Sequence, residues 1–289
     1  MIKTKSIIGA LLVSILLAAV PAAAQEGHST PEISKEAWSF AGVFGTYDRN
    51  QLQRGFQVFR EVCSSCHSAR LMAFRNLAEP GGPEFTEGQV KALAAEYEIN
   101  DAEAEGGKRP GIAADRWPSP FASDQEARDA NGGAVPPDMS VLAKARGTTQ
   151  PFPWWILNYF TAYSEGGPDY IHALLNGYHE EVPHGVTNSD GTPFTLPEGK
   201  AYNDFFPGHA IGMAPPLSDG LVTYEEGETG SVPLTVDQYS RDVSAFLMWM
   251  AEPHLVSRKE AGFQVIALLL VFAGLMYLVK RKIWSRIEH

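Results

Sequence analysis

Cysteine is scarce in this chain, because only two of its 289 residues are cysteines. A scaffold of several disulfides is therefore excluded, and so is a structural zinc site with four cysteine ligands. The sequence also has little of the apolar–polar alternation that predicts strands, no internal repeat and no low-complexity tract. These absences favour a mainly α-helical fold, with long loops where glycine and proline gather.

Basic residues are also few, with 23 lysines and arginines against 34 acidic residues and a formal net charge of −11. This balance disfavours a nucleic-acid-binding function. Several of the basic residues lie in clusters at the two ends, so the intervening domain is more acidic still. An acidic surface suits a basic protein partner, which it attracts by long-range electrostatics. Solubility alone is the other explanation for this charge.

Long apolar runs occur only near the two ends of the chain. At the N-terminus, Lys3 and Lys5 precede an apolar stretch at 7–20, and Ala22-Ala23-Ala24 follows it. A charged region, a short apolar core and small residues in this order predict a signal peptide at 1–24 that is cleaved before Gln25. The alternative is an uncleaved membrane anchor.

A second apolar run covers residues 261–279, where Gln264 is the one polar side chain. As a helix this run would be about 28 Å long, enough to cross the hydrocarbon core of a bilayer. Lys280-Arg281-Lys282 follow, and basic residues stay on the cytoplasmic side. We therefore predict a bacterial inner-membrane protein with a periplasmic domain at 25–258, one anchor at 259–280 and a cytoplasmic tail at 281–289. A buried core helix is the alternative.

Both cysteines lie in the motif Cys63-Ser64-Ser65-Cys66-His67. Two thiols three positions apart can each bond one vinyl group of a haem, and the adjacent histidine can bind the iron as proximal ligand. A redox dithiol or half of a zinc site would use the same cysteines. The first needs a strand–turn–helix setting and the second needs another cysteine pair, and neither is present. The motif therefore predicts one covalent c-type haem.

Two segments, at 51–69 and 235–252, have apolar residues at helical spacing. We expect these helices to cross at Gly55, which has no side chain to keep them apart, and to support one edge of the haem. The second segment begins at a possible capping box, Thr235 and Gln238, and stops at Pro253. Three further helices are predicted: one after a capping box at Thr86 and Gln89, one capped by Asp138 and ending near Arg146, and one that has Pro168 in its first turn, runs through Asn176 and ends at Gly177.

The second axial ligand of the iron must come from elsewhere in the chain. Met213 lies in a loop, 207–217, where glycine and alanine allow a close approach to the porphyrin and prolines hold the backbone. Met139, after Pro136-Pro137-Asp138, is a competing candidate, and His209 would serve in a bis-histidine site. Ligation by a thioether rather than a second imidazole raises the reduction potential.

Several segments together resemble one family. They are the haem motif, Asn131-Gly132-Gly133-Ala134-Val135-Pro136-Pro137-Asp138, Gly166-Gly167-Pro168-Asp169-Tyr170, residues 202–217, residues 242–249 and Ala251-Glu252-Pro253 before the anchor. In this order they are similar to the cytochrome c1 family, the membrane-anchored haem subunits of the cytochrome bc1 complex (ubiquinol–cytochrome c reductase). The resemblance covers nearly all of the predicted mature chain.

The resemblance implies a mainly α c-type cytochrome domain with long loops and one C-terminal transmembrane helix. It implies iron ligation by His67 and Met213, a haem propionate paired with Arg146, and a haem pocket formed by Asn131, Pro136, Pro137, Tyr170, Leu174 and Phe206. The implied partners are cytochrome b, a Rieske iron–sulfur protein that donates electrons and a c-type cytochrome that accepts them. The resemblance also implies that the chain transfers electrons and makes or breaks no substrate bond by itself.

Two other functions use the same motif: a haem peroxidase with an open distal site, and a haem subunit of a terminal oxidase or dehydrogenase. The chain also departs from the family pattern. It lacks an extra cysteine pair that some bacterial relatives have before the methionine, and its aromatic segment 150–163 looks like an insertion. Two acidic runs are candidate docking surfaces, although such runs are often only solvated: Glu96, Glu98, Asp101, Glu103 and Glu105; and Glu225, Glu226 and Glu228.

Overall fold

The computed structural model describes residues 32–148, 152–153, 156, 158, 163–188, 190–224 and 231–285. The predicted signal peptide, the second acidic run and most of the aromatic segment 150–163 lie outside these residues, as do residues 286–289. The helices, strands and contacts named for the structure all belong to the described residues.

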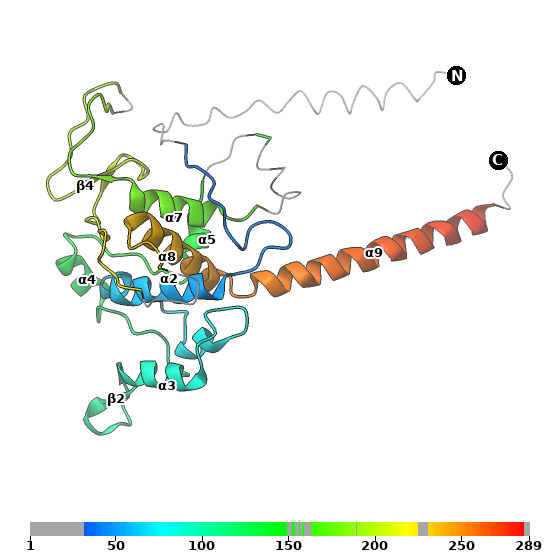
Figure 1. Ribbon diagram of the computed structural model, residues 1–289, viewed down its shortest axis with the longest axis horizontal. Coiled ribbons are helices and arrows are strands. Elements are labelled where there is room, and N and C mark those ends of the chain that lie inside the picture. The colour runs from blue at the N-terminus through cyan, green and yellow to red at the C-terminus, as the bar shows by residue number, and fades with distance from the viewer. Residues whose placement is uncertain are drawn as a thin grey trace, which may run out of the picture.

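The described chain is mainly helical, as the sequence predicts, and one long helix extends from a domain with long loops (Figure 1). The helices are α2 (Arg49–Glu61), η1 (Cys63–Ser65), η2 (Phe74–Ala78), α3 (Glu87–Ala95), η3 (Glu105–Gly107), α4 (Asp124–Ala130), α5 (Leu142–Ala145), α7 (Gly166–Asn176), α8 (Val236–Ala251) and α9 (Leu255–Trp284). The strands are β1 (Glu98–Asn100), β2 (Lys108–Pro110), β3 (Tyr178–His179), β4 (Ala201–Asn203) and β5 (Ala210–Ile211). The strands form two small antiparallel sheets, β1-β2 and β3-β4-β5.

The core of the domain is the crossing of α2 and α8, which confirms the predicted helix pair (Figure 1). A Cβ atom at Gly55 would lie 2.1 Å from the backbone oxygen of Asp242, so only glycine permits this approach. Beside the contact, Arg54 Nε donates to the fully buried Asp242 carboxylate at 2.8 Å. Phe56 and Phe59 pack against Phe246 in the adjoining aromatic cluster. The two apolar stripes thus bury each other.

Helix α2 ends at Glu61, eight residues before the predicted end. Two serines explain the difference, because Ser64 Oγ donates to the Arg60 oxygen and Ser65 Oγ donates to the Val62 oxygen. These bonds satisfy carbonyl groups that a continuing helix would have paired with its own N–H groups. The chain then tightens into the 3₁₀ turn η1, which contains the first cysteine of the motif.

The predicted capping residues have different outcomes. Thr86 and Gln89 form the full capping box of α3, as predicted. Thr235 caps α8, but the Gln238 side chain donates to Asp242 at 2.9 Å instead of returning to the cap. An unpaired carboxylate costs more free energy when it is buried, as Asp242 is, than an unpaired N–H group costs at a helix end that water can reach. The Gln238 side chain therefore bonds to Asp242 and not to the backbone N–H of Thr235.

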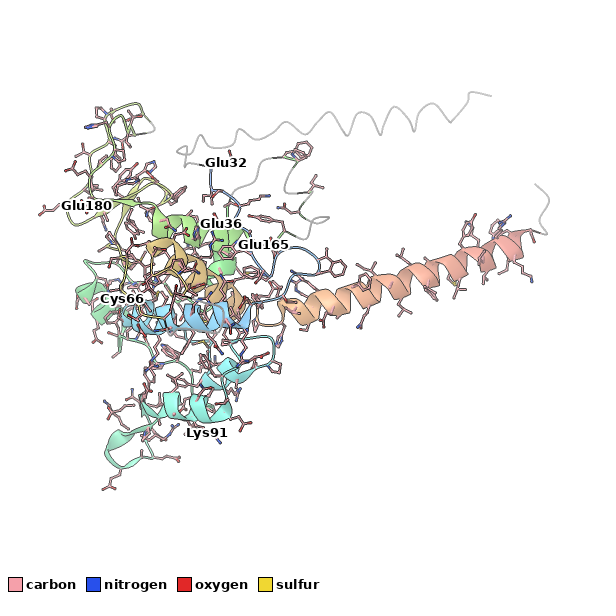
Figure 2. All side chains as sticks on the ribbon, in the orientation of Figure 1. Glu32, Glu36, Cys66, Lys91, Glu165 and Glu180 are labelled. Carbon is pink, nitrogen blue, oxygen red and sulfur yellow. The ribbon has the colours of Figure 1, made fainter. Side chains whose placement is uncertain are left out.

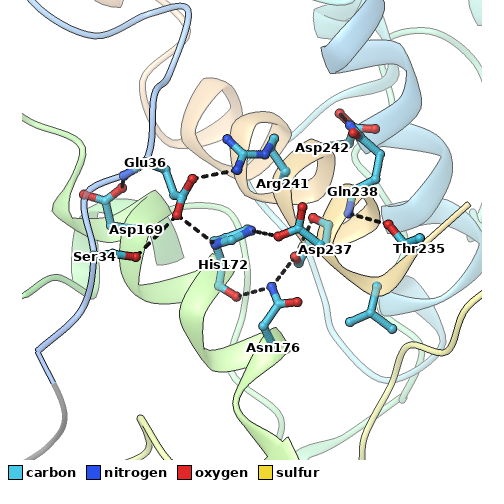
Figure 3. A network of polar contacts seen from close by, with 12 residues as sticks. Ser34, Glu36, Asp169, His172, Asn176, Thr235, Asp237, Gln238, Arg241 and Asp242 are labelled. Atoms are coloured by element: carbon cyan, nitrogen blue, oxygen red, sulfur yellow. Dashed lines mark hydrogen bonds and ion pairs between the residues drawn. The ribbon is translucent and has the colours of Figure 1, made fainter. Parts of the chain in front are cut away.

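Helix α7 runs from Gly166 to Asn176 and stops at Gly177, as predicted, and it packs on α8 and α5. The buried Asp169 carboxylate fixes this helix by accepting from Trp38 Nε1 at 2.7 Å and from the backbone N–H of Glu36 at 3.0 Å. Figure 3 shows the adjoining network, in which Glu36 pairs with Arg241 of α8 and His172 of α7 contacts Asp237. The N-terminal segment is thereby fastened across α7 and α8.

Helix α9 contains the predicted anchor and begins four residues before its predicted start. It is 30 residues long with a mean hydropathy of 2.3 over its most apolar window, and none of that window is buried against the domain. A soluble core helix would be covered, so the exposure of apolar side chains around the whole helix indicates a membrane span.

Candidate haem site

The Cys-x-x-Cys-His motif forms a compact turn at the end of α2. The backbone N–H groups of Cys66 and His67 both bond to the Cys63 oxygen, at 3.2 and 2.9 Å. Neither Cys63 nor Cys66 forms a disulfide, and Cys66 is exposed. Figure 2 places Cys66 at the end of the domain that is remote from the start of α9. Two thiols that are close together but not joined to each other suit a pair of separate thioether bonds.

The reactivity of Cys63 argues against a redox dithiol. Burial raises the pKa of the Cys63 thiol to about 12, and the neighbouring Cys66 adds to the rise. Redox-active Cys-x-x-Cys pairs have the opposite property, a lowered thiol pKa. The zinc alternative is not supported either, because no group of three His, Cys, Asp or Glu side chains among the described residues is arranged to hold a metal ion.

The imidazole of His67 is oriented by a backbone carbonyl. Its Nδ1 lies 2.8 Å from the carbonyl oxygen of Pro137, which can only accept a hydrogen bond, so Nδ1 carries the proton and Nε2 has the free lone pair. Burial lowers the pKa of His67, against opposing effects of the Pro137 carbonyl and of Asp138. An oriented ring with an unprotonated Nε2 is what an iron ligand requires.

Asp138 joins the loop 136–140 to the motif instead of capping a helix, so that prediction is wrong. Its carboxylate accepts from Ser68 Oγ at 2.7 Å and from the N–H groups of Arg70 and Ser140, both at 2.9 Å. Burial opposes ionisation, but these hydrogen bonds prevail and lower the pKa of Asp138. Helix α5 has no side-chain cap. Asp138 thus fixes the carbonyl that orients His67.

The backbone of Met139 lies next to His67. Its N–H donates to the Ser68 oxygen at 2.8 Å, and its side chain is buried in the main hydrophobic cluster. If His67 is the proximal ligand, as predicted, a methionine whose backbone is bonded directly beside it is poorly placed to reach the opposite face of a haem. The structure therefore favours Met213 over Met139 as the second ligand.

The helices α5 and α7 bring Arg146 and Tyr170 together. Gly167 permits this approach, because a Cβ atom there would lie 1.6 Å from the Ala143 oxygen. Arg146 is exposed at the end of α5. Burial raises the pKa of the Tyr170 phenol, and the nearby Arg146 charge opposes the rise. A guanidinium beside a protonated phenol offers several hydrogen-bond donors to a carboxylate such as a propionate.

Asn203 connects Leu174 with Phe206. Its side chain, which is fully buried, donates to the Leu174 oxygen at 2.7 Å and accepts from the N–H groups of Phe205 and Phe206 at 3.0 and 3.1 Å. One amide therefore fixes the end of α7 against the start of the methionine loop. Leu174 and Phe206 themselves are half-buried, as expected of residues that border a pocket.

Met213 is positioned through its backbone by Tyr178. The phenol of Tyr178 donates to the Met213 oxygen at 3.1 Å. Burial raises the pKa of Tyr178, and nearby Tyr170 adds to the rise, so this donor keeps its proton at neutral pH. His209, the bis-histidine candidate, instead stacks on Tyr202 with ring centroids 5.5 Å apart, and its Nδ1 lies 3.2 Å from the Asn203 oxygen.

The predicted wall residues Asn131, Pro136 and Pro137 lie between α4 and the motif. Asn131 Nδ2 donates to the Ala127 oxygen at 2.7 Å and closes α4. Pro136 and Cys66 line a cavity of about 250 Å³, whereas Pro137 contributes its carbonyl to His67. The structure thus gives Pro137 a defined orienting contact, which the sequence pattern alone does not predict.

Most of the first acidic run is already neutralised. Glu96 pairs with Arg60, Glu98 with Lys108, and Asp101 with Arg109. Glu103 and Glu105 are exposed and have no ion pair among the described residues. This arrangement weakens the run as a docking surface, because the field of a paired carboxylate is largely cancelled at a distance.

Sequence reasoning did not identify Tyr178 and Asn203 as site residues. Asn203 lies within the segment that carries the family resemblance, and Tyr178 directly follows the glycine that ends α7. An amide and a phenol close in sequence to the segments that resemble the family were the available signals. Their partners are backbone carbonyls far along the chain, which no local pattern reveals.

Comparisons with known proteins agree with this geometry. The profile described as the Cytochrome C1 family matches residues 38–287. The chain is 53% identical to "Cytochrome b/c1" of Bradyrhizobium diazoefficiens over 91% of its own length and 37% of that protein's, so it spans little more than a third of that relative. It is 46% identical to "Cytochrome c1" of Blastochloris viridis, over 96% of this chain and 95% of the relative. It is 42% identical to "Cytochrome c1" of Rhodospirillum rubrum, over 97% of each chain.

The residues matched by the family profile include the haem motif, the methionine loop and the membrane helix. Members of the matched family have a covalently bound c-type haem, and the donor set described above fits one. Among the described residues, α9 is the one helix that is long and apolar enough to cross a membrane, and a membrane anchor is a feature of the cytochrome c1 family. The chain belongs to the cytochrome c1 family.

Proposed function

We propose that this chain is the electron-transferring haem subunit of a quinol–cytochrome c reductase, in which it assembles with cytochrome b and a Rieske iron–sulfur protein. The observation that supports it best is the pair of restrained ligand candidates. His67 is oriented by the Pro137 carbonyl, and Met213 is held by the Tyr178 phenol. An iron with two protein ligands exchanges single electrons with little rearrangement and excludes small molecules.

When bound, the haem supplies a one-electron couple. Cys63 and Cys66 would hold it covalently, and His67 and Met213 would bind its iron. Arg146, with Tyr170, would neutralise a propionate, while Leu174 and Phe206 would exclude water from one edge. Asp138, which is half-buried and accepts three hydrogen bonds, would hold in place the Pro137 carbonyl that keeps His67 in one tautomer. None of these residues has to move or exchange a proton during transfer.

We further propose that the domain at 25–258 faces the periplasm of a bacterial inner membrane, with the anchor at 259–280 and residues 281–289 in the cytoplasm. Lys280, Arg281 and Lys282 at the far end of α9 support this orientation, because short basic segments are retained on the cytoplasmic side. The signal peptide proposed at 1–24 would deliver the domain to the compartment where c-type haem is attached. The immediate electron acceptor would be a c-type cytochrome.

The peroxidase alternative requires an open distal position, and the restrained Met213 loop argues against it. The remaining alternative, a subunit of an oxidase or dehydrogenase, differs in its partners and not in its haem site. Family membership favours the quinol-oxidising assembly.

The test is purification of the full chain from its own membrane in mild detergent. We expect a c-type spectrum, colour that acidic acetone does not extract, and co-purifying cytochrome b and Rieske protein.

In the ferric state, Met213→Leu should lose the long-wavelength band of thioether ligation and bind imidazole or cyanide. The control Met139→Leu should keep that band, because Met139 is a packing residue. Loss of the band in Met139→Leu with retention in Met213→Leu would refute the ligand assignment. Oxidase or dehydrogenase subunits in place of cytochrome b and the Rieske protein would refute the assembly.

A further inference from the structure

The turn at residues 39–46 presents two apolar side chains to the outside of the domain. The N–H of Thr46 bonds to the Ser39 oxygen at 3.0 Å and closes the turn. Gly42 has a φ of +69°, and a Cβ atom at Gly45 would lie 2.1 Å from the Ala41 oxygen, so glycine is needed at both positions. At the tip, Phe44 is 81% exposed and Val43 is 44% exposed. Ordering this turn costs conformational entropy. We therefore expect the phenylalanine ring at its tip to contact an apolar environment.

Two contacts fasten this turn to the start of α9. Lys259 Nζ donates to the Phe40 oxygen at 2.6 Å, and the Phe44 ring meets the Phe263 ring edge-to-face, with centroids 6.0 Å apart. Lys259 and Phe263 are four residues apart and therefore lie on one face of the helix. Phe40 is fully buried, so the base of the turn belongs to the domain core. Figure 1 shows this N-terminal loop beside the first turns of α9.

A cavity of about 290 Å³ lies between the turn and the helix. Its apolar lining includes Val43, Phe44, Val256 and Phe263, and its polar lining is formed by Thr46, Lys259, Glu260 and Gln264. This mixture of aromatic, aliphatic and polar groups resembles the environment at the edge of a bilayer, where acyl chains meet headgroups.

The position of the turn indicates what covers it. Phe263 is 58% exposed and begins the apolar surface that continues along α9 through the membrane. The tip of the turn therefore extends the lipid-facing surface of the anchor sideways, at the level where the helix leaves the domain. A protein partner that covered Phe44 would have to enter the same interfacial layer.

We propose that the turn 39–46 is a second membrane contact, which inserts Val43 and Phe44 into the interfacial layer of the bilayer among phospholipids. A single helix lets a domain rotate about the helix axis. A second contact beside the helix removes much of that freedom. It would fix which side of the domain faces the membrane and therefore how far the Cys66 end stands from it.

The test uses spin labels on the full-length holoprotein in nanodiscs of phosphatidylcholine and phosphatidylglycerol. The two native cysteines are consumed by the haem under the proposed function, so Phe44→Cys adds the one free thiol of the chain. Collision rates with oxygen and with a water-soluble nickel chelate report depth. We expect label 44 to have a high oxygen-to-nickel ratio, near that of Leu270→Cys in the anchor. Label Ile112→Cys, which is also exposed but follows β2 at the far side of α3, should give a ratio typical of water.

The same labels are then measured in the purified complex, with the unsubstituted complex as background. A lipid-like ratio at position 44 there supports the proposal. A water-like ratio at position 44 in nanodiscs would overturn it. Low collision rates with both reagents in the complex would also overturn it, because they would show a protein neighbour instead of lipid. Failure to find a haem in the purified chain would instead count against the proposed function, and the depth at position 44 would then be measured in a Phe44→Cys variant whose Cys63 and Cys66 are replaced by serine.

Discussion

Replacing Tyr178 by phenylalanine tests whether the Met213 loop is held mainly by one hydrogen bond. The substitution keeps the ring and its packing and removes the phenol that donates to the Met213 oxygen at 3.1 Å. The haem motif and the His67 contacts are untouched. The change therefore isolates the restraint on one proposed ligand.

The size of the effect depends on the energy of that bond. A net hydrogen bond of this kind contributes about 0.5–1.5 kcal/mol. Because binding of imidazole or cyanide to the ferric iron requires Met213 to leave, the lost restraint should tighten that binding by roughly two- to twelvefold. The effect should be the same across neutral pH, since burial and nearby Tyr170 raise the pKa of Tyr178 and keep the donor protonated.

The assay is an optical titration of the ferric holoprotein with imidazole. The matched control is Tyr47→Phe, because the Tyr47 phenol also donates to a backbone oxygen, that of Glu252, at 3.1 Å, but lies at the anchor end of the domain. Tyr47→Phe should lower stability and leave the imidazole affinity unchanged. Equal affinity in wild type and Tyr178→Phe would refute the reasoning, and so would an equal gain in the control.

Three further predictions concern packing, charge and pH. Gly55→Ala should lower the thermal midpoint, because its Cβ would meet the Asp242 oxygen, and overpacking of this kind lowers the free energy of unfolding by about 1–3 kcal/mol. The control Gly88→Ala, whose Cβ meets nothing within 4 Å, should not lower the thermal midpoint. Arg146→Gln should lower the reduction potential in an optical redox titration, by ~40 mV for each kcal/mol by which the lost positive charge stabilised the ferrous state over the ferric state, and Arg146→Lys should restore part of it. A potential that Arg146→Gln does not change would remove the propionate role. Hydrogen bonds from Arg109 and from the Ile112 N–H lower the pKa of Asp115 from 3.8 to about 2. The unfolded chain therefore binds more protons, so stability from this group is present above about pH 4 and is lost as the pH falls towards 2. As the pH falls from 4 to 2, the thermal midpoint of Asp115→Asn should therefore fall less steeply than that of the wild type. An identical slope in the two proteins would contradict the lowered pKa of Asp115.

The sequence by itself determined the features that depend on neighbours in the chain. The haem motif is recognisable because its chemistry needs two thiols and an imidazole at fixed spacing. The anchor is recognisable because a bilayer requires a minimum apolar length. The α3 capping box and the end of α7 at Gly177 depend on bonds within a few residues. Gly55 was also predictable, because a glycine inside an apolar helical stripe has few other uses.

Only the tertiary structure decided the features that depend on distant partners. Asp138 has the position of a helix cap in the sequence, but its carboxylate finds better donors at Ser68 and Arg70. The composition of the loop 207–217 already favours Met213 over Met139, and the bond from Met139 to Ser68 and the bond from Tyr178 to Met213 are the tertiary contacts that add to that preference. Each of these contacts joins segments tens of residues apart, and a buried polar group takes whichever partner the fold brings within reach. No pattern along the chain contains that information.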